Sequence, residues 1–143
     1  SMAAKTTIST VKRLEPSPAS VDISSYCRDL DQWPRSWMGV EQDLAPGEQL
    51  LPPFRRFIEH LVASDLSAKT IGHHVDNLWS LGGEIIRDLH YNKGLRKLPA
   101  GHLLRQSVHM YGGPAIHNGS EEQQRSFDAT CRKLHRFLEN AAA

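Results

Sequence analysis

Cysteine is scarce in this chain, and long apolar stretches are missing. The two cysteines, Cys27 and Cys131, are too few for the disulfide framework of a small secreted domain. No apolar run approaches the roughly 18 residues that a membrane span requires. The first 20 residues also lack the apolar segment of a secretory signal. We therefore expect a cytoplasmic protein that does not span a membrane.

The short motifs of several enzyme classes are absent as well. The chain has no Gly-x-Ser-x-Gly segment, and neither cysteine lies in a local pattern typical of a catalytic thiol. The glycine-rich segment Gly112-Gly113-Pro114 lacks the Lys-Ser/Thr pair that completes a phosphate-binding loop. These absences predict a protein that is not an enzyme, with no catalytic residue and no cofactor.

Eight histidines in a chain of 143 residues raise the question of a metal site. His73 and His74 are adjacent, so on a helix their side chains point to different sides. The remaining histidines are scattered, whereas zinc sites need ligands at short, fixed spacings. We therefore predict no metal site, and we expect the histidines to be exposed to solvent or to make a single hydrogen bond.

Length and composition indicate one globular domain. The chain has 143 residues, of which 39% are hydrophobic and 23% charged, which is enough for one hydrophobic core. Pro16 and Pro18, with flanking Ser and Ala, indicate that residues 1–20 form a flexible arm. We predict a single helical domain over residues 21–143.

Apolar residues recur at helical spacing in four segments, and no segment alternates as a strand does. The pattern therefore predicts an all-α fold, a small four-helix bundle. The four helices are expected near residues 48–63, 67–91, 101–111 and 120–140.

The ends of these helices carry recognisable signals. Pro52 and Pro53 are expected in the first turn of the first helix, where a missing N–H costs little. Ser67 is a good N-cap for the second helix. Ser120 and Gln123 form a capping box at the start of the fourth helix.

The second helix has the clearest apolar stripe. Leu78 and Ile85 lie in its middle and are expected to be buried. Gly82 and Gly83 interrupt this helix at about 1 kcal/mol each relative to alanine. We interpret them as a place where another helix approaches closely, and the alternative is a functional kink. The helix should stop around Tyr91–Gly94, where Gly94 can take the left-handed C-terminal conformation.

Trp33 and Trp37 flank Pro34 in the segment before the first predicted helix. Tryptophan carries a large apolar area that usually has to be buried. The pattern predicts a loop or short helix that lies across the core.

The middle of the chain is mildly basic, although the net charge is only +1. Residues 51–105 carry eight Lys/Arg and five Asp/Glu. The start of the second helix combines hydroxyls, free N–H groups and a lysine, a set suited to phosphate. We predict DNA contacts on the polar face of this helix from Ser67, Lys69, Thr70, His73 and Arg87.

A second basic feature lies on the fourth helix. Arg125, Arg132 and Arg136 share one side of it, because seven and eleven residues are close to whole turns. Arginines in a row can follow a nucleic-acid backbone. The alternative is a solvated face on which the arginines form salt bridges with Asp128 and Glu139.

Part of the chain resembles the SAM-like core-binding domain of tyrosine recombinases, the phage integrases. The residues that carry this resemblance are Phe54-Arg-Arg-Phe-Ile-Glu-His-Leu, Asp65-Leu-Ser-Ala-Lys-Thr-Ile and Val75-Asp-Asn-Leu. The resemblance covers about 54–89. It implies an orthogonal four-helix module that forms half of a clamp around duplex DNA, here without the catalytic domain.

His102 and Arg105 have the His-x-x-Arg spacing of the recombinase active site, but they fall inside the binding domain. We interpret this match as coincidence, because its structural context is missing. The leading hypothesis is a non-catalytic DNA-binding module, accessory to a mobile-element or phage-related process. The alternative is an adaptor that binds a protein partner, or a second copy of itself, through Trp33, Trp37 and Trp79.

Overall fold

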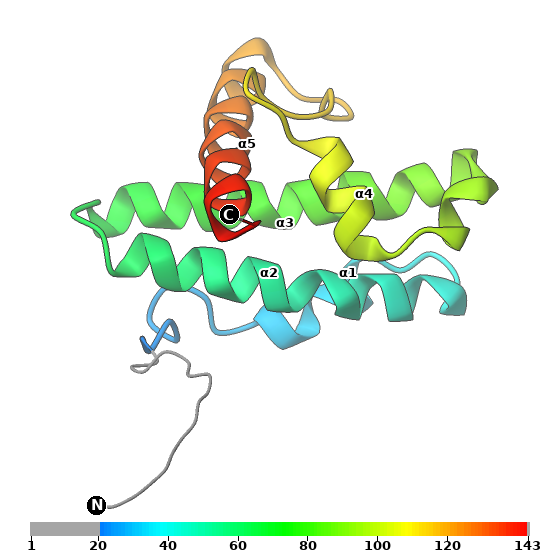
Figure 1. Cartoon of the computed structure of the whole chain (residues 1–143), viewed down its shortest axis with the longest axis horizontal. Coiled ribbons are helices and arrows are strands. Elements are labelled where there is room, and N and C mark those ends of the chain that lie inside the picture. Colours follow the sequence, from blue (N-terminus) through cyan, green and yellow to red (C-terminus); the bar gives the residue numbers. More distant parts are fainter. Residues whose placement is uncertain (1–20, 143) are drawn as a thin grey trace, which may run out of the picture.

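The computed structural model describes residues 21–142, and most of them are helical (Figure 1). This part of the chain contains no strand and five α-helices, so the predicted all-α class is confirmed. The predicted arm at residues 1–20 lies outside the described residues. The helices are α1 (Trp33–Trp37), α2 (Leu44–Val62), α3 (Ala68–Tyr91), α4 (Ala100–Ser107) and α5 (Glu121–Ala142), with 3-10 turns at Leu30–Gln32, Glu41–Asp43 and Lys93–Lys97.

The four predicted helices correspond to α2–α5, but α2 begins at Leu44 rather than near residue 48. Pro52 and Pro53 therefore lie inside the helix, and their predicted place in the first turn is wrong. Each proline removes an N–H that would donate four residues back. Pro52 and Glu48 are both exposed, so the carbonyl of Glu48 that loses its donor lies on the solvent side of α2.

The predicted N-terminal caps are confirmed. Ser67 Oγ accepts a hydrogen bond from the Thr70 N–H at 3.1 Å. Ser120 Oγ accepts from the Gln123 N–H at 3.1 Å, and Gln123 Oε1 accepts in return from the Ser120 N–H at 2.8 Å. These caps satisfy N–H groups that no helical carbonyl reaches.

The second helix ends at Tyr91 as predicted, but the left-handed cap predicted at Gly94 and the predicted end of the third helix are wrong. Gly94 does not take a left-handed conformation, because Gly112 and Asn118 alone have positive φ between residues 21 and 142. The side chain of Asn92 accepts from the Gly94 N–H instead. The third helix, α4, stops at Ser107 rather than Tyr111, since His109 and Gly112 pair across a tight turn.

The core lies between α2 and α3, which run side by side in opposite directions, with α5 across them and α4 against α2 (Figure 1). Leu78 and Ile85 are buried as predicted, at 0% and 3% exposed. No helix of the described region is long and apolar enough to cross a membrane. The largest fully buried side chains are Phe54, Phe57, Phe127, Leu50, Ile58, Leu61, Ile71, Leu78, Leu81, Ile86, Leu89 and Leu104.

The short helix α1 lies across α2 and α3, as the tryptophans predicted. Its Trp37 indole rests on Gly82, where an added Cβ would lie 2.1 Å from Trp37 Cζ2. The interpretation of Gly82 as a point of close approach is therefore confirmed, with α1 as the approaching helix. Any larger residue at position 82 would displace the indole.

Candidate functional site

Three of the predicted DNA-binding residues, Arg125, Arg132 and Arg136, lie on the side of α5 that faces away from the core. We call them the α5 arginine stripe. Arg125 and Arg136 are exposed and Arg132 is half-buried. Among residues 21–142, none of the three forms an ion pair with a carboxylate. Their guanidinium groups therefore keep most of their donors for a ligand.

The salt bridges offered as the alternative, to Asp128 and Glu139, are not found in this part of the chain. The Asp128 carboxylate is occupied elsewhere. Its Oδ1 accepts from the Gly113 N–H at 3.1 Å and from Gln124 Nε2 at 3.0 Å. Asp128 therefore anchors the segment before α5 and forms no ion pair with the arginines among the described residues.

The start of α3 holds four more of the predicted residues: Ser67, Lys69, Thr70 and His73. Ser67 Oγ donates to Thr70 Oγ1 at 3.0 Å and accepts from the Thr70 N–H, so both hydroxyls take part in the cap. Lys69 is exposed, and so is His73. Among the described residues, no hydrogen bond or ion pair links this group to the α5 arginine stripe.

Arg87 lies apart from the start of α3. It follows Lys69 by 18 positions on one helix, which is roughly 27 Å at 1.5 Å per residue. The two residues therefore cannot contact one small ligand. Arg87 instead lines a groove of about 590 Å³ that runs along α3, with Trp37, Trp79, His90, Tyr91 and His117. We call this the α3 groove.

The three tryptophans do not form one exposed surface. Trp33 is buried at 4% exposed, so its predicted role in partner binding is wrong. Trp37 is half-buried, and its Nε1 donates to the Trp79 carbonyl at 2.9 Å. Trp79 is 45% exposed in the α3 groove, while its Nε1 donates to Ser36 Oγ at 2.9 Å. Of the three, Trp79 alone keeps much of its ring open to solvent.

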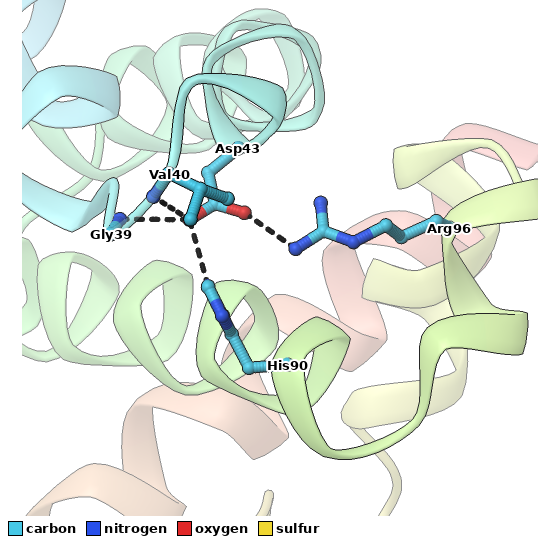
Figure 2. Close-up of polar contacts among 5 residues, drawn as sticks. All are labelled: Gly39, Val40, Asp43, His90 and Arg96. Atoms are coloured by element: carbon cyan, nitrogen blue, oxygen red, sulfur yellow. Dashed lines mark hydrogen bonds and ion pairs between the residues drawn. The ribbon is translucent and has the colours of Figure 1, made fainter.

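A charged cluster lies at the C-terminal end of α3, and its residues were not among the predicted site residues (Figure 2). The Asp43 carboxylate is fully buried just before α2. Its Oδ2 accepts from the N–H groups of Gly39 (2.8 Å) and Val40 (3.1 Å) and from His90 Nε2 (2.8 Å). Its Oδ1 accepts from Arg96 Nη2 at 2.8 Å. Asp43 thus ties the α1–α2 connection to the C-terminal end of α3.

These contacts set the charge state of the cluster. Burial alone would raise the pKa of Asp43, but the donors at Gly39, Arg96, Val40 and His90 outweigh it and hold the pKa below its usual range. An ionised carboxylate only accepts, so His90 Nε2 must carry the proton that it donates. Asp43 is therefore a paired anion at neutral pH, and no oxygen of it is left for a substrate.

A neutral network lies where α3 meets α5. Asn77 Nδ2 donates to Thr130 Oγ1 at 2.9 Å, and the Thr130 hydroxyl lies 2.6 Å from His74 Nδ1. Burial, with Lys133 and His73 nearby, lowers the pKa of His74. His74 is therefore neutral, and the tautomer of its ring sets which of Nδ1 and the Thr130 hydroxyl donates. His74 is thus buried and hydrogen-bonded, whereas the adjacent His73 is exposed.

Neither cysteine is suited to nucleophilic chemistry. Both thiols are free and buried. Burial, followed by the nearby Asp128, raises the pKa of Cys131 to about 12, and burial, followed by Asp29, raises the pKa of Cys27 to about 11. Almost no thiolate forms at neutral pH in either case. Within residues 21–142, no group of three or more His, Cys, Asp or Glu side chains could hold a metal ion.

No protein-family model, curated protein or solved structure matches this chain. Membership in the recombinase core-binding family therefore stays a prediction, and function has to be argued from the surfaces above. The local sequence held one weak signal for the Asp43 cluster, an acidic residue three positions after Val40 at a helix start. Nothing local pointed to its partners His90 and Arg96, which are 47 and 53 residues away.

Proposed function

We propose that this chain is a non-catalytic module that binds duplex DNA through the α5 arginine stripe. The observation that carries the proposal is the absence of any ion pair between Arg125, Arg132 or Arg136 and a carboxylate of residues 21–142. Exposed arginines on folded domains are often neutralised by neighbouring acids. Three that are not, on one side of one helix, form a row of donors for phosphate.

The spacing of the stripe supports this proposal. At 1.5 Å per residue, Arg125 and Arg132 are roughly 10 Å apart along α5, and Arg132 and Arg136 roughly 6 Å. Charges at these intervals can meet successive phosphates of a strand. Lys133 and His60 line a shallow depression with Arg136 and extend the basic surface toward the C-terminal end of α2.

The start of α3 supplies the second part of the proposed interface. The N–H groups of the first turn have no helical acceptor, and the exposed Lys69 lies beside them. Ser67, Thr70 and His73 complete this contact in the proposal. Arg87 is proposed as a separate, distant contact, because roughly 27 Å of helix lie between it and Lys69.

We further propose that α2–α5 form a bundle of the SAM-like core-binding type. The resembling segments fall on α2, on the turn that follows and on the first half of α3. This is the part of the molecule that carries the start of α3 and supports α5. An accessory role in a mobile-element or phage-related process would follow from that relationship.

The test is a fluorescence anisotropy titration of a labelled duplex at several salt concentrations, beginning at low salt. Arg132→Ala should weaken binding to all sequences and lower the slope of log K against log salt by about 0.9, since one phosphate contact is lost. Lys69→Ala should act in the same direction. Arg35, exposed on α1 away from the stripe, provides the matched control, and Arg35→Ala should leave the slope unchanged.

Two results would contradict the proposal. One is the absence of binding to any duplex at low salt by a protein that circular dichroism shows to be folded. The other is binding that Arg132→Ala, Lys69→Ala and Arg35→Ala all affect equally.

One observation favours a second candidate function, the binding of a protein segment in the α3 groove. Trp79 is 45% exposed there, and the exposed Arg87 has no ion-pair partner among residues 21–142. The groove therefore suits a peptide with an apolar side chain for Trp79 and a carboxylate for Arg87.

This candidate is tested by selection from a random peptide library on the whole chain. Peptides that pair an apolar with an acidic residue should be enriched, and both Trp79→Ala and Arg87→Ala should abolish their binding. Sedimentation equilibrium of the protein alone tests the homodimer. A monomer and a selection without any enriched pattern would leave the groove without a binding role.

A further inference from the structure

Two apolar side chains protrude from the connection between α4 and α5, which is yellow to orange in Figure 1. Met110 and Tyr111 are 65% and 76% exposed. They are the central residues of a tight turn, which we call the 109–112 turn. The His109 N–H donates to the Gly112 carbonyl at 2.9 Å, and the Gly112 N–H donates back at 3.1 Å. Grouped apolar side chains that stay exposed mark contact surfaces.

The 109–112 turn is held firmly against α5. Gly112 has φ +150°, and a Cβ there would lie 2.5 Å from Asp128 Oδ1. A Cβ on Gly113 would lie 2.5 Å from Cys131 Sγ. Only glycine allows so close an approach at these two positions. With the hydrogen bond from the Gly113 N–H to Asp128, these contacts hold the backbone of the turn against α5.

The turn lies directly beside the α5 arginine stripe. Arg132 Nη1 donates to the Tyr111 carbonyl at 3.5 Å, which leaves the other guanidinium donors free. The His109 and Tyr111 rings are 6.3 Å apart, measured between centroids. One small surface thus combines aromatic rings, a flexible apolar side chain and an arginine. This is the combination with which proteins stack on nucleobases while they hold the neighbouring phosphate.

We propose that Met110 and Tyr111 contact an exposed nucleobase while Arg132 binds a neighbouring phosphate, so that the preferred ligand is duplex DNA interrupted by an unpaired base. This inference rests on the proposed DNA-binding function and names the DNA structure that the same interface selects. In a continuous duplex, both faces of each base are covered, and exposing one requires unstacking. An unpaired base is already displaced at little cost, and the 109–112 turn supplies the surface that receives it.

The experiment compares two labelled duplexes of equal length, one continuous and one with a single unpaired thymidine at its centre. The whole chain should bind the interrupted duplex more tightly. Tyr111→Ala should weaken binding to the interrupted duplex by about 5- to 150-fold, the range for one lost base stack, and remove the preference. Its salt slope should stay unchanged, because no cation is lost. Arg132→Ala should lower the slope on both duplexes.

Leu98 provides the control, because it is a 37% exposed apolar side chain that precedes α4, whereas the turn follows α4. Leu98→Ala should bind both duplexes as the wild type does. Equal wild-type affinity for the two duplexes, with an Arg132-dependent slope, would overturn this inference and leave the proposed function standing. Equal effects of Tyr111→Ala and Leu98→Ala would also overturn it. The absence of binding to either duplex would overturn both proposals.

Discussion

Helix α3 carries a buried polar cluster near each end, and the two are built differently. Near its C-terminal end, His90 and Arg96 surround the ionised Asp43, which is fully buried. In its N-terminal half, His74 and Asn77 meet Thr130 in a neutral network. The first cluster joins the α1–α2 connection to the end of α3 and to the 3-10 turn that follows it, and the second joins α3 to α5. The comparison shows that the same protein places a partly exposed histidine against a buried full charge in one place and buries a histidine among neutral partners in the other.

The physical consequence is a difference in how each cluster responds to a missing partner. A buried charge that loses its partner stays costly, because it has neither water nor a counter-charge. A neutral hydroxyl or amide that loses its partner leaves a smaller desolvation penalty. The cluster around Asp43 should therefore tolerate substitution less well than the network around Thr130.

The largest effect is expected from Asp43→Asn. The substitution removes the negative charge that His90 and Arg96 share. It also replaces one of the two carboxylate oxygens, which together accept four hydrogen bonds, by an NH₂ group that can only donate. Breaking a buried pair typically lowers the free energy of unfolding by about 3–5 kcal/mol. Urea denaturation followed by circular dichroism measures the loss. An Asp43→Asn variant as stable as the wild type would show that the charge is not what holds this end of α3.

A smaller loss is expected from Thr130→Val, which keeps the shape of the side chain and deletes its hydroxyl. Asn77 and His74 each lose a partner, at a total of about 1–3 kcal/mol. The matched control is Ser126→Ala, one turn earlier on α5, where Asn77 binds an exposed hydroxyl. Its effect in the same denaturation assay should be within about 0.5 kcal/mol. A loss from Thr130→Val as large as that from Asp43→Asn would remove the contrast between the clusters.

The pH dependence of stability distinguishes the two clusters by the group that titrates in each. The folded-state pKa of His74 is below the usual 6.5, so the unfolded chain binds a proton first as the pH falls. The stabilisation that His74 contributes is complete above about pH 6.5 and is lost below it. Asp43 has a lowered pKa, so its stabilisation persists until the pH falls below about 4. The urea midpoint of the wild type should decrease as the pH is lowered from 8 to 5. The midpoint of His74→Asn should decrease less steeply over the same range. Lys133 and His73, which also influence the pKa of His74, stay unchanged in this variant.

The smallest effect is expected at the surface. Arg55 and Asp31 form an ion pair of 3.2 Å with side chains 44% and 78% exposed. Water and salt screen such a pair, so Asp31→Asn should change the free energy of unfolding by at most about 1 kcal/mol. Compared with Asp43→Asn, this variant makes the same chemical change outside the core. Similar losses from the two would mean that burial does not set the energy of the Asp43 cluster.

Much of the fold was predictable because its signals are local. The Ser67 cap and the Ser120–Gln123 box act over three residues. The apolar stripe that buries Leu78 and Ile85 repeats with the helix period. The start of α2 was missed because prolines at positions 52 and 53 are more common at a helix start than inside it. The end of α4 was missed because the 109–112 turn depends on contacts with α5.

The candidate site was predictable only in part. The arginine stripe followed from helical spacing, and Arg125 and Arg136 are exposed while Arg132 is half-buried. The sequence did not show whether Asp128 would form an ion pair with the arginine stripe. Its carboxylate instead accepts a hydrogen bond from the Gly113 N–H, which is 15 positions away. The tryptophan surface was predicted as one patch, yet Trp33 turned inward and left Trp79 in the groove. Trp33 on α1 is buried and Trp79 on α3 is exposed because of how the helices pack, and this cannot be predicted from composition.

By itself, the sequence determined the helices of residues 21–142, most of their caps and the faces that enter the core, since these depend on neighbours within one or two turns. Only the tertiary structure decided that Trp37 would rest on Gly82 and that Asp43 would meet His90 and Arg96. It also decided that the 109–112 turn would lie beside Arg132. These contacts join residues that are 21 to 53 positions apart. Such pairs form only when whole helices pack, because their geometry depends on every element between them.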